Sequence, residues 1–571
     1  MTYTRLGDLL LSVGLITDEQ LSQALKHQKI SKQRLGQELI DEKIITEQQL
    51  VDALRIQLGI DFVDLSSTFI KPQMAEILPK NIARKNNVVP VRVSGDTLYL
   101  AMNDPLNFMA QEEVKTATRK RVVPMIATTQ GIEHAISSLY GSEGAARAIA
   151  DMKREIAAGV RIPGREDADN FIANNIGGEE ENGIAPTVRL VNSILERAIL
   201  EHASDIHIEP YETEVRVRMR IDGVMHSMMT VPKALQASVI SRLKVMGAMD
   251  ITERRVPQDG RAGVRVMAKN VDLRMSTLPT IFGEKFVIRL LDKDARLLTR
   301  ENIGLHGAEV NQYLELIRRP SGVVLIAGPT GSGKSSTMYT MIRELNTEKV
   351  NLVTLEDPVE YNIPGINQVQ INEKTGMTFA GGLRSILRQD PDIIAVGEIR
   401  DGETAEIVMR AAITGHLVLS TIHTNDALST VDRLLDIGVE PYLISSALNG
   451  VISQRLVRRI CPECREEYTP SREELEDMGI PAASGRKFYH GRGCPACLGT
   501  GYRGRVGVFE ILIISRGLRR AIVKGVGRED LEEIARREGR FVTLQENCRH
   551  LVEEGVTTVE EARRVIAAVE E

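Results

Sequence analysis

The sequence predicts a multidomain α/β protein built around a P-loop nucleotide-binding core. Three observations predict this: an apolar strand that runs into a glycine-rich phosphate-binding motif and a helix, a tandem repeat near the N-terminus, and two Cys-x-x-Cys pairs toward the C-terminus. The length of 571 residues corresponds to roughly three to five domains of ordinary size. One activity is therefore not expected to account for the whole chain.

Composition excludes several classes of protein. Hydrophobic residues make up 42% and charged residues 26% of the chain, as in an ordinary soluble protein. The net charge of −6 gives no chain-wide attraction to nucleic acid or to anionic lipid. Apolar runs such as Val323–Ala327 have the length of strands, and Leu9–Ile16 leads into Asp18-Glu19 without a small-residue cleavage site. We therefore expect a cytoplasmic protein with no signal peptide and no membrane span.

The N-terminus carries a tandem repeat, Arg5–Gln28 and Arg34–Gln57, in which eleven of 24 aligned positions are identical. Apolar residues at helical spacing mark a first helix in each repeat, and Gly14 is placed to end the first of them. Thr17 with Gln20, and Thr46 with Gln49, form capping boxes that start a second helix. Each repeat is thus predicted to be a helical hairpin, and from these residues alone a small helical adaptor is one interpretation.

The paired motifs also resemble the cyclic di-GMP-binding domain at the N-terminus of certain pilus and secretion ATPases. The resemblance implies that the arginine, the backbone near the glycine, the leucines and the final glutamine of each motif hold guanine and phosphate groups. In this sequence those positions are Arg5, Gly7, Leu10, Gly14, Leu25 and Gln28, with Arg34, Gly36, Leu39, Leu54 and Gln57. Lys43 replaces the glycine in the second motif, where a left-handed backbone disfavours lysine, so the second half-site is expected to differ.

The chain then continues as mixed α/β structure, with Val88–Val93 and Thr97–Met102 as predicted strands. Together with the repeats it is expected to form a regulatory domain of residues 1–140. Residues 141–185 are rich in Gly, Ala and Glu, which is typical of a flexible linker.

Residues 186–295 are predicted to form an α/β domain of their own. The run Val215–Ile221 alternates in polarity and turns at Asp222-Gly223, which is the signature of a β-hairpin.

Residues 296–571 carry the strongest chemical signal, a complete Walker A motif after Val323–Ala327. A chance glycine-rich turn is the alternative, but strand, loop and helix follow in the required order. Backbone N–H groups would cradle phosphates, Lys334 would reach the β- and γ-phosphates, and the Ser335 hydroxyl would ligate Mg²⁺. The predicted ATP-binding residues of the motif are Gly328, Thr330, Gly331, Ser332, Gly333, Lys334, Ser335 and Ser336.

Three further strand ends carry polar groups. Ile393–Val396 ends at Gly397-Glu398 without the usual Walker B aspartate, 354–360 holds three carboxylates, and 414–424 brackets a strand with two histidines. One such strand end is usually structural, but several of them after a P-loop strand predict a site.

These boxes resemble the secretion ATPase superfamily that powers type II secretion and type IV pilus assembly. The resemblance implies a RecA-like motor after a PAS-like domain, with Glu356 as the base that activates water and Glu398 as the acid of the Mg²⁺ shell. It implies His423 as a γ-phosphate sensor and His416 as its structural companion. It also implies four arginines that face the nucleotide, some across a subunit boundary of a hexamer, namely Arg274, Arg289, Arg388 and Arg433.

Two Cys-x-x-Cys pairs, separated by 29 residues, define a module over 461–497. Four thiolates at this spacing suit a closed, structural Zn²⁺ site, whereas a redox dithiol, the alternative, needs one pair. The predicted ligands are Cys461, Cys464, Cys494 and Cys497. Such an insert is a feature of the assembly and secretion branches of the resembled superfamily. Nearby Arg455, Arg458 and Arg459 either contact an acidic partner or lipid head groups, or form a solvated basic turn.

The leading hypothesis is a cytoplasmic hexameric ATPase that assembles type IV pili. It would use ATP, Mg²⁺ and Zn²⁺, respond to cyclic di-GMP, and reach the inner face of the cytoplasmic membrane through a platform protein and accessory components. A type II secretion ATPase is the alternative with the same chemistry. A receptor that binds ATP without turnover is a hypothesis of another class. A nucleic-acid motor is a third, which the acidic net charge disfavours.

Overall fold

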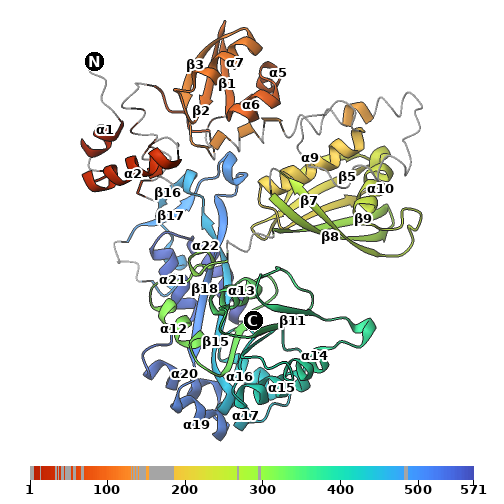
Figure 1. Cartoon of the computed structure of the whole chain (residues 1–571), viewed down its shortest axis with the longest axis vertical. Coiled ribbons are helices and arrows are strands. Elements are labelled where there is room, and N and C mark those ends of the chain that lie inside the picture. The colour runs from red at the N-terminus through yellow and green to blue at the C-terminus, as the bar shows by residue number, and fades with distance from the viewer. Residues whose placement is uncertain are drawn as a thin grey trace. The chain divides into compact units, whose positions relative to one another are not determined.

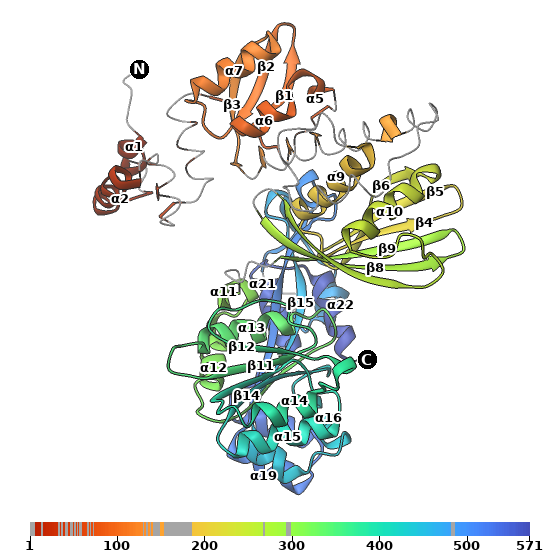
Figure 2. The same ribbon diagram turned by 45° about the vertical axis from the view of Figure 1, so that its right-hand side comes forward.

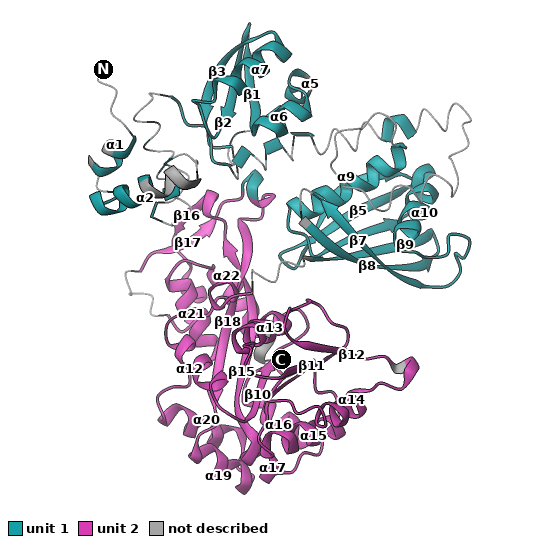
Figure 3. Ribbon diagram, in the orientation of Figure 1, with its two compact units in different colours: residues 1–292, 494–496 teal, residues 293–493, 497–571 magenta. Residues whose placement is uncertain are grey.

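The computed structural model describes residues 6–12, 15–31, 35, 38–39, 44–45, 50, 53, 55, 60–65, 68, 70–71, 73–129, 131–132, 135–136, 139–140, 149–152, 185–266, 269–292, 298–480 and 486–570. Its contacts define two compact units (Figure 3). One contains residues 1–292 with 494–496, and the other contains residues 293–493 with 497–571.

The repeats share one hydrophobic core. In the first repeat, α1 (Leu6–Ser12) precedes α2 (Asp18–Ser31). The Thr17 N–H donates to Gln20 Oε1 at 2.8 Å, and the Gln20 N–H donates to Thr17 Oγ1 at 3.3 Å, which confirms the first predicted capping box. Thr46 and Gln49 lie outside the described residues. The buried core consists of three equivalent pairs, Leu10 and Leu39, Ile16 and Ile45, and Ala24 and Ala53.

A three-stranded sheet follows (Figure 1, orange) in the order β1-β2-β3, in which β1 and β2 are antiparallel and β2 and β3 parallel. Its strands confirm the two predicted in this segment. The Tyr140 hydroxyl donates to Leu78 O at 2.7 Å beside the core of this sheet. The elements are α5 (Met74–Ile77), α6 (Lys80–Asn86), β1 (Val88–Ser94), β2 (Thr97–Met102), α7 (Phe108–Thr118) and β3 (Arg121–Ile126). Of the predicted linker, only 149–152 and 185 are among the described residues.

A six-stranded antiparallel sheet has the order β6-β5-β4-β9-β8-β7. Two helices, α9 and α10, pack their apolar residues against one face of it (Figure 2). The predicted hairpin is present, with Asp222 at φ 48° and Gly223 at φ 84° between β5 and β6. The elements are α9 (Pro186–Leu200), β4 (Asp205–Pro210), β5 (Glu214–Ile221), β6 (Val224–Pro232), η2 (Lys233–Leu235), α10 (Gln236–Met246), β7 (Gln258–Val266), β8 (Lys269–Thr280) and β9 (Gly283–Asp292).

The second unit is built on a seven-stranded sheet in the order β12-β11-β13-β14-β10-β15-β18, parallel except for β18. Successive residues of β10 enter different cores, since Val323 and Leu325 pack with α15 and α17 and Val324 and Ile326 pack with α12 and α13. The elements are α11 (Arg300–Ile303), α12 (Gly307–Ile317), β10 (Gly322–Ala327), α13 (Lys334–Leu345), β11 (Leu352–Glu356), β12 (Asn367–Gln370), η4 (Glu373–Thr375), α14 (Phe379–Ile386), β13 (Ile393–Val396), α15 (Gly402–Ile413), β14 (Leu417–Ile422), α16 (Ser429–Asp436), α17 (Pro441–Ala447), β15 (Leu448–Ile460), β18 (Tyr502–Ile513), α19 (Arg516–Lys524) and α20 (Arg528–Arg537).

Beyond the sheet, β15 and β18 lead to the cysteine pairs, and a third core of this unit forms beside them. Cys548 is fully buried in that core, where it packs as a small apolar residue. Within the described ranges, no helix is both long enough and apolar enough to cross a bilayer. The elements are η5 (Pro462–Cys464), β16 (Arg465–Tyr468), α18 (Arg472–Asp477), β17 (Phe488–Gly491), η6 (Pro495–Cys497), α21 (Leu544–Glu553) and α22 (Val559–Glu570).

Candidate nucleotide-binding site and metal centre

Four of the predicted site residues lie at the carboxyl ends of neighbouring parallel strands. Lys334 follows the loop after β10, and Glu356 is the last residue of β11. Glu398 lies two residues beyond β13, and His423 directly follows β14. Because these strands are adjacent and parallel, the four side chains meet at one edge of the sheet, which is where α/β proteins bind ligands.

The phosphate-binding loop depends on its glycines. Gly331 and Gly333 have φ angles of 81° and 90°, which favour glycine. A Cβ atom on Gly328 would lie 2.5 Å from Ser332 Oγ and 2.7 Å from Gln454 O, so backbone packs closely there. Thr330 and Ser335 are exposed, and Ser336 is half-buried. The loop therefore turns its backbone and the Ser335 hydroxyl toward solvent at the start of α13.

Lys334 lies beneath this loop. Its Nζ donates to Gly328 O at 2.8 Å and to Pro329 O at 3.0 Å, and its side chain is buried. Burial lowers the pKa of Lys334 to about 8, although the carboxylate of Glu398 acts in the opposite direction. A phosphate group in the loop would supply the counter-charge that this ammonium group needs.

Glu356 is 3% exposed and accepts hydrogen bonds from three side chains. Tyr339 donates from its hydroxyl to Oε2, while Thr354 Oγ1 and Gln368 Nε2 donate to Oε1 at 2.5 and 3.1 Å. Burial, with the nearby carboxylate, raises the pKa of Tyr339 above its ordinary value, so the phenol remains a donor. A carboxylate has about four acceptor positions, and these donors leave one for a water molecule.

Glu398 lies between the side chains of Arg400 and His423. Arg400 Nε donates to Oε1 at 2.6 Å, and His423 Nε2 lies 3.3 Å from Oε2. Arg400 also approaches Asp357, with Nη2 3.8 Å from Oδ2. Sequence reasoning missed Arg400, although it lies two residues after Glu398 and therefore stays at the same strand end.

The structure places His416 away from this edge, and it leaves Arg388 and Arg433 exposed on the surface. His416 precedes β14, so it lies at the opposite end of that strand, about 23 Å from His423 at 3.3 Å per residue. His416 Nδ1 is 2.8 Å from Ala411 O at the end of α15. Arg388, after α14, donates to Arg384 O at 2.9 Å and is exposed, and Arg433 is exposed on α16.

Arg274 and Arg289 are paired across β8 and β9 in the other unit. The same row continues to Arg261 on β7 and to Asp205 and Arg220 on β4 and β5. Arg289 Nε donates to Asp205 Oδ1 at 3.2 Å. Residues of one row share a face, and here it is the face opposite α9 and α10. Arg261 and Arg220 were missed, although the alternation of arginines along their strands is visible in the sequence.

Among the predicted cyclic di-GMP residues that the structure describes, some are buried in the core and others are exposed. Leu10 and Leu39 are fully buried, so their side chains offer no surface to a ligand here, whereas Leu25 is 41% exposed. Gly7 allows close helix packing, because a Cβ atom there would lie 2.9 Å from Leu21. Gln28 belongs to α2. The other predicted residues lie outside the described ranges, namely Arg5, Gly14, Arg34, Gly36, Leu54 and Gln57, as does Lys43.

The four predicted metal ligands converge. The Sγ atoms of Cys461, Cys464, Cys494 and Cys497 all lie within 4.8 Å of one another, and all four residues are buried. Cys464 Sγ is 3.9 Å from Cys497 Sγ, and the edge of a Zn–S₄ tetrahedron is about 3.8 Å for Zn–S bonds of 2.3 Å. The Gly501 N–H points at Cys497 Sγ at 3.2 Å, as expected around a thiolate. The donor set therefore fits Zn²⁺.

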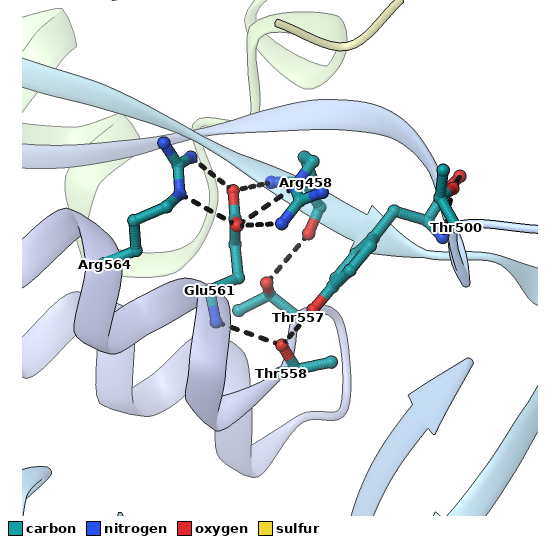
Figure 4. Close-up of polar contacts among 7 residues, drawn as sticks. Arg458, Thr500, Thr557, Thr558, Glu561 and Arg564 are labelled. Atoms are coloured by element: carbon teal, nitrogen blue, oxygen red, sulfur yellow. Dashed lines mark hydrogen bonds and ion pairs between the residues drawn. The ribbon is translucent and has the colours of Figure 1, made fainter. Parts of the chain in front are cut away.

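The basic residues before this cluster are not a solvated turn. Arg455 is 5% exposed. Arg458 makes an ion pair with the fully buried Glu561 of α22, Nη2 to Oε2 2.7 Å, and Arg564 contacts the same carboxylate (Figure 4). The Thr557 hydroxyl donates to Arg458 O at 2.8 Å. Only Arg459 of the three arginines is exposed, so the other two pack the fold together and are not available to a partner.

Comparison with known proteins gives consistent matches. The family described as "Type II/IV secretion system protein" matches residues 180–564, and the MshEN domain matches residues 58–146. The type IV pilus assembly ATPase PilB of Myxococcus xanthus is 42% identical over 98% of both chains. Type II secretion system protein E of Dickeya dadantii is 42% identical over 86% of this chain and 98% of its own. The solved structure of the Yersinia pseudotuberculosis ATPase DotB covers 70% of this chain and 96% of its own, with a TM-score of 0.51 at 20% identity.

Proposed function

We propose that this chain, which is an ATPase of the type II/IV secretion family, couples ATP hydrolysis to assembly of a type IV pilus. It has the α/β multidomain fold of secretion ATPases, with an N-terminal domain and a tetracysteine cluster. The convergence of Lys334, Glu356, Glu398 and His423 at one sheet edge carries the proposal. Full-length similarity to a pilus assembly ATPase supports the choice of cargo.

Ser335 and Glu398 would hold Mg²⁺. The exposed hydroxyl at the start of α13 and the carboxylate after β13 are oxygen donors, which Mg²⁺ prefers, so these residues fit the ion. When bound, Mg²⁺ supplies positive charge to the β- and γ-phosphate oxygens. Lys334 and the loop N–H groups bind the same phosphates, and they orient the γ-phosphorus toward Glu356.

Glu356 would act as the base. The remaining acceptor position of its carboxylate would take the proton of the attacking water. Hydrogen bonds from Tyr339, Thr354 and Gln368 hold the carboxylate in place. His423 Nε2, now 3.3 Å from Glu398, would donate to a γ-phosphate oxygen and so report whether that phosphate is present. Both steps depend on side chains that the strand ends already position.

We further propose that the chain works as a homohexamer, in which arginines of one subunit complete the site of the next. The row on β7, β8 and β9 offers Arg261, Arg274 and Arg289 on one sheet face, and Arg388 and Arg433 are exposed on the ATPase unit. The guanidinium groups of these five arginines would donate charge-assisted hydrogen bonds to the phosphates of a nucleotide. His416 would brace the loop before β14 through Ala411 O, away from the nucleotide.

The domain division proposed is 1–140, a linker 141–185, a PAS-like domain 186–295, and a RecA-like ATPase domain 296–571 with Zn²⁺ at 461–497. Hydrophobic cores in the first, third and fourth segments support it, although the third core also includes Met152 from the proposed linker. The N-terminal tandem motif, proposed as a helical repeat, would bind cyclic di-GMP and regulate turnover. The MshEN match directly after the repeats supports this assignment. The protein would be cytoplasmic, at the inner membrane face through a platform partner.

ATP turnover by wild type, Lys334→Ala and Glu398→Ala tests the enzymatic part. Wild type should exceed both variants by at least about 100-fold, since each variant removes a group that stabilises the transferred phosphoryl. Equal rates would reduce the P-loop unit to a nucleotide-binding switch. A deletion strain complemented with this gene should regain surface pili. Restored protein export without pili would favour type II secretion, which similarity to protein E keeps as the second candidate.

Calorimetry with cyclic di-GMP tests the regulatory part. Full-length wild type should bind, and the Arg5→Ala, Arg34→Ala double variant should bind at least tenfold more weakly, because each guanidinium would contact phosphate or guanine. Absence of binding by wild type would leave the repeats as an adaptor.

A further inference from the structure

Strand β15 runs beside the strand that carries the phosphate-binding loop. β10 and β15 are parallel, and the last residue of β10, Ala327, pairs with Ser453. The residues that follow this pair are Gly328, directly after β10, and Gln454, within β15. The β15 strand therefore accompanies the chain to the point where the loop begins.

Gln454 holds the phosphate-binding loop directly. It is 2% exposed, and its Nε2 donates to Ser332 O at 2.7 Å. Its own carbonyl oxygen packs so close to Gly328 that any Cβ atom at that position would lie 2.7 Å away. A buried amide that donates to a loop carbonyl restricts that loop, and losing the donor leaves the carbonyl unpaired. Gln454 thus fixes the loop from beneath, at two points.

Arg455 holds a different loop, the one that carries His423. It is 5% exposed, and its Nη2 donates to Asn425 O at 2.8 Å, two residues beyond His423. Successive side chains of a strand point to opposite faces, so neighbours on β15 reach separate loops. A buried guanidinium requires fixed acceptors, and Arg455 also donates to Gln454 O at 3.3 Å.

The loop that Arg455 contacts is also fixed from elsewhere. The Ala427 N–H donates to the buried Glu510 of β18 at 2.8 Å. Arg528 Nη2 donates to Asp426 Oδ2 at 2.7 Å, and Asp426 Oδ1 accepts from the Ser429 N–H at the start of α16. These contacts anchor the loop nearer its far end, whereas Arg455 contacts the part nearest His423.

We propose that Gln454 and Arg455 are positioning residues of the ATPase site, Gln454 for the phosphate-binding loop and Arg455 for the His423 loop. One strand thereby sets the spacing between the group that binds phosphate and the group that senses it. This inference rests on the proposed roles of Lys334 and His423. It assigns the two residues different kinetic signatures, because one acts through nucleotide binding and the other through turnover.

The test compares Gln454→Met, Arg455→Met and Arg455→Lys in the full-length hexamer, with Arg459→Ala, exposed on the same strand, as the matched control. Gln454→Met should raise KM for ATP and Kd for ADP about tenfold and change kcat less than threefold. Arg455→Met should lower kcat at least tenfold with Kd for ADP within twofold of wild type. Arg455→Lys, which retains a donor for Asn425 O, should recover part of kcat.

Effects of both Met variants no larger than those of Arg459→Ala would overturn the proposal, as would parallel changes in KM and kcat. If Arg455→Met does not fold, a cycle of Arg455→Lys with His423→Ala decides. The lysine variant should lower kcat in the wild-type background but not after His423 is removed, and equal effects in both backgrounds contradict the assignment. ADP binding by Lys334→Ala distinguishes failure of the positioning proposal from failure of the proposed nucleotide site. Undiminished binding would mean that the nucleotide site itself is misassigned.

Discussion

Glu398 and Glu561 lie in the same kind of surroundings, yet they differ in what those surroundings permit. Each of these two carboxylates contacts two basic side chains, Arg400 and His423 for Glu398, and Arg458 and Arg564 for Glu561. Glu398 is 19% exposed in its side chain, and one partner is a histidine that is half-exposed. Glu561 is fully buried, with two arginines as partners.

The difference separates a carboxylate that can exchange its partners from one that only stabilises the fold. Burial alone would raise the pKa of Glu561, but hydrogen bonds from Arg564 and Arg458 outweigh it and hold the pKa below its ordinary value. That carboxylate is charged and saturated, so it can only fasten α22 to β15. Glu398 has partners that can move away, because the side chains of His423 and Arg400 are both about half-exposed and Arg400 has Asp357 within 3.8 Å. Accessible, exchangeable partners therefore distinguish the carboxylate proposed to be catalytic from the structural one.

The largest expected effect breaks the comparison on the catalytic side. Glu398→Gln should lower kcat by about a thousand-fold, because the amide cannot supply the charge that a Mg²⁺ shell requires, as when other preorganised electrostatic groups are removed. Thermal unfolding should be nearly unchanged. Glu403→Gln, an exposed carboxylate on α15, serves as the matched control and should retain wild-type turnover.

The second effect breaks the comparison on the structural side. Glu561→Leu removes the buried carboxylate that Arg458 and Arg564 share, so unfolding free energy should fall by about 3 kcal/mol, measured by urea titration of the purified protein. The folded fraction should still hydrolyse ATP at a near-normal rate. Glu560→Leu, next to it and exposed, is the control. A loss of kcat without a loss of stability would contradict the structural reading.

Low pH should weaken the same interactions of Glu561 with Arg458 and Arg564. Because the pKa of Glu561 is lowered in the folded state, its stabilisation is fully present above the ordinary carboxyl pKa of 4.5 and is lost as pH falls below it. Wild type should therefore lose stability more steeply than Glu561→Gln between about pH 5 and pH 3. Parallel curves of unfolding free energy against pH for the two proteins would show that the ion pairs of Glu561 do not contribute to stability.

A smaller effect concerns Lys334, the buried cation beneath the phosphate-binding loop. Burial lowers the pKa of Lys334 to about 8, so free protein loses this charge as pH rises through 8, whereas bound phosphate favours the protonated amine. Affinity for ADP should be constant below about pH 7.5 and then fall by up to tenfold per pH unit, with proton uptake on binding. Calorimetry in buffers of different ionisation enthalpy measures both, and Lys334→Arg should remove the pH dependence.

The smallest effect compares the two arginines that contact Glu561. The Arg564 side chain is 62% exposed and that of Arg458 is 16% exposed, although both contact Glu561. Arg564→Ala should cost about 0.5 kcal/mol of unfolding free energy, as exposed ion pairs do, and Arg458→Ala should cost several times more. Equal losses, measured in the same urea titrations, would show that exposure does not set their contributions.

Sequence reasoning located groups that a motif fixes and missed groups that only the fold brings together. The strand-end residues were predictable because adjacent parallel strands place their carboxyl ends side by side, and the cysteines because their spacing suits tetrahedral ligation. His416 was grouped with His423 because both flank one strand, but the two ends of a strand lie far apart. Arg261 became visible only through the register of β7 against β8.

The basic triplet shows the same limit. Arg455, Arg458 and Arg459 read as one patch, but a strand alternates its faces, and the partners of the first two come from loops and helices about 30 and 100 residues away. No local pattern predicts such pairings. Conversely, identity between the N-terminal repeats proved a mixed signal, since Leu10 and Leu39 are core residues in this structure.

That shared core has a consequence for how the N-terminal segment arose. Leu10, Ile16 and Ala24 have their equivalents from the second repeat in the same cluster, so the described residues of the two repeats build one core between them. A single ancestral repeat would have needed a second copy of itself, as isologous dimers do. Duplication and fusion would then have turned that dimer into one chain and freed each half to diverge. Lys43, opposite Gly14 in the alignment, is the kind of asymmetry that only a fused pair can acquire.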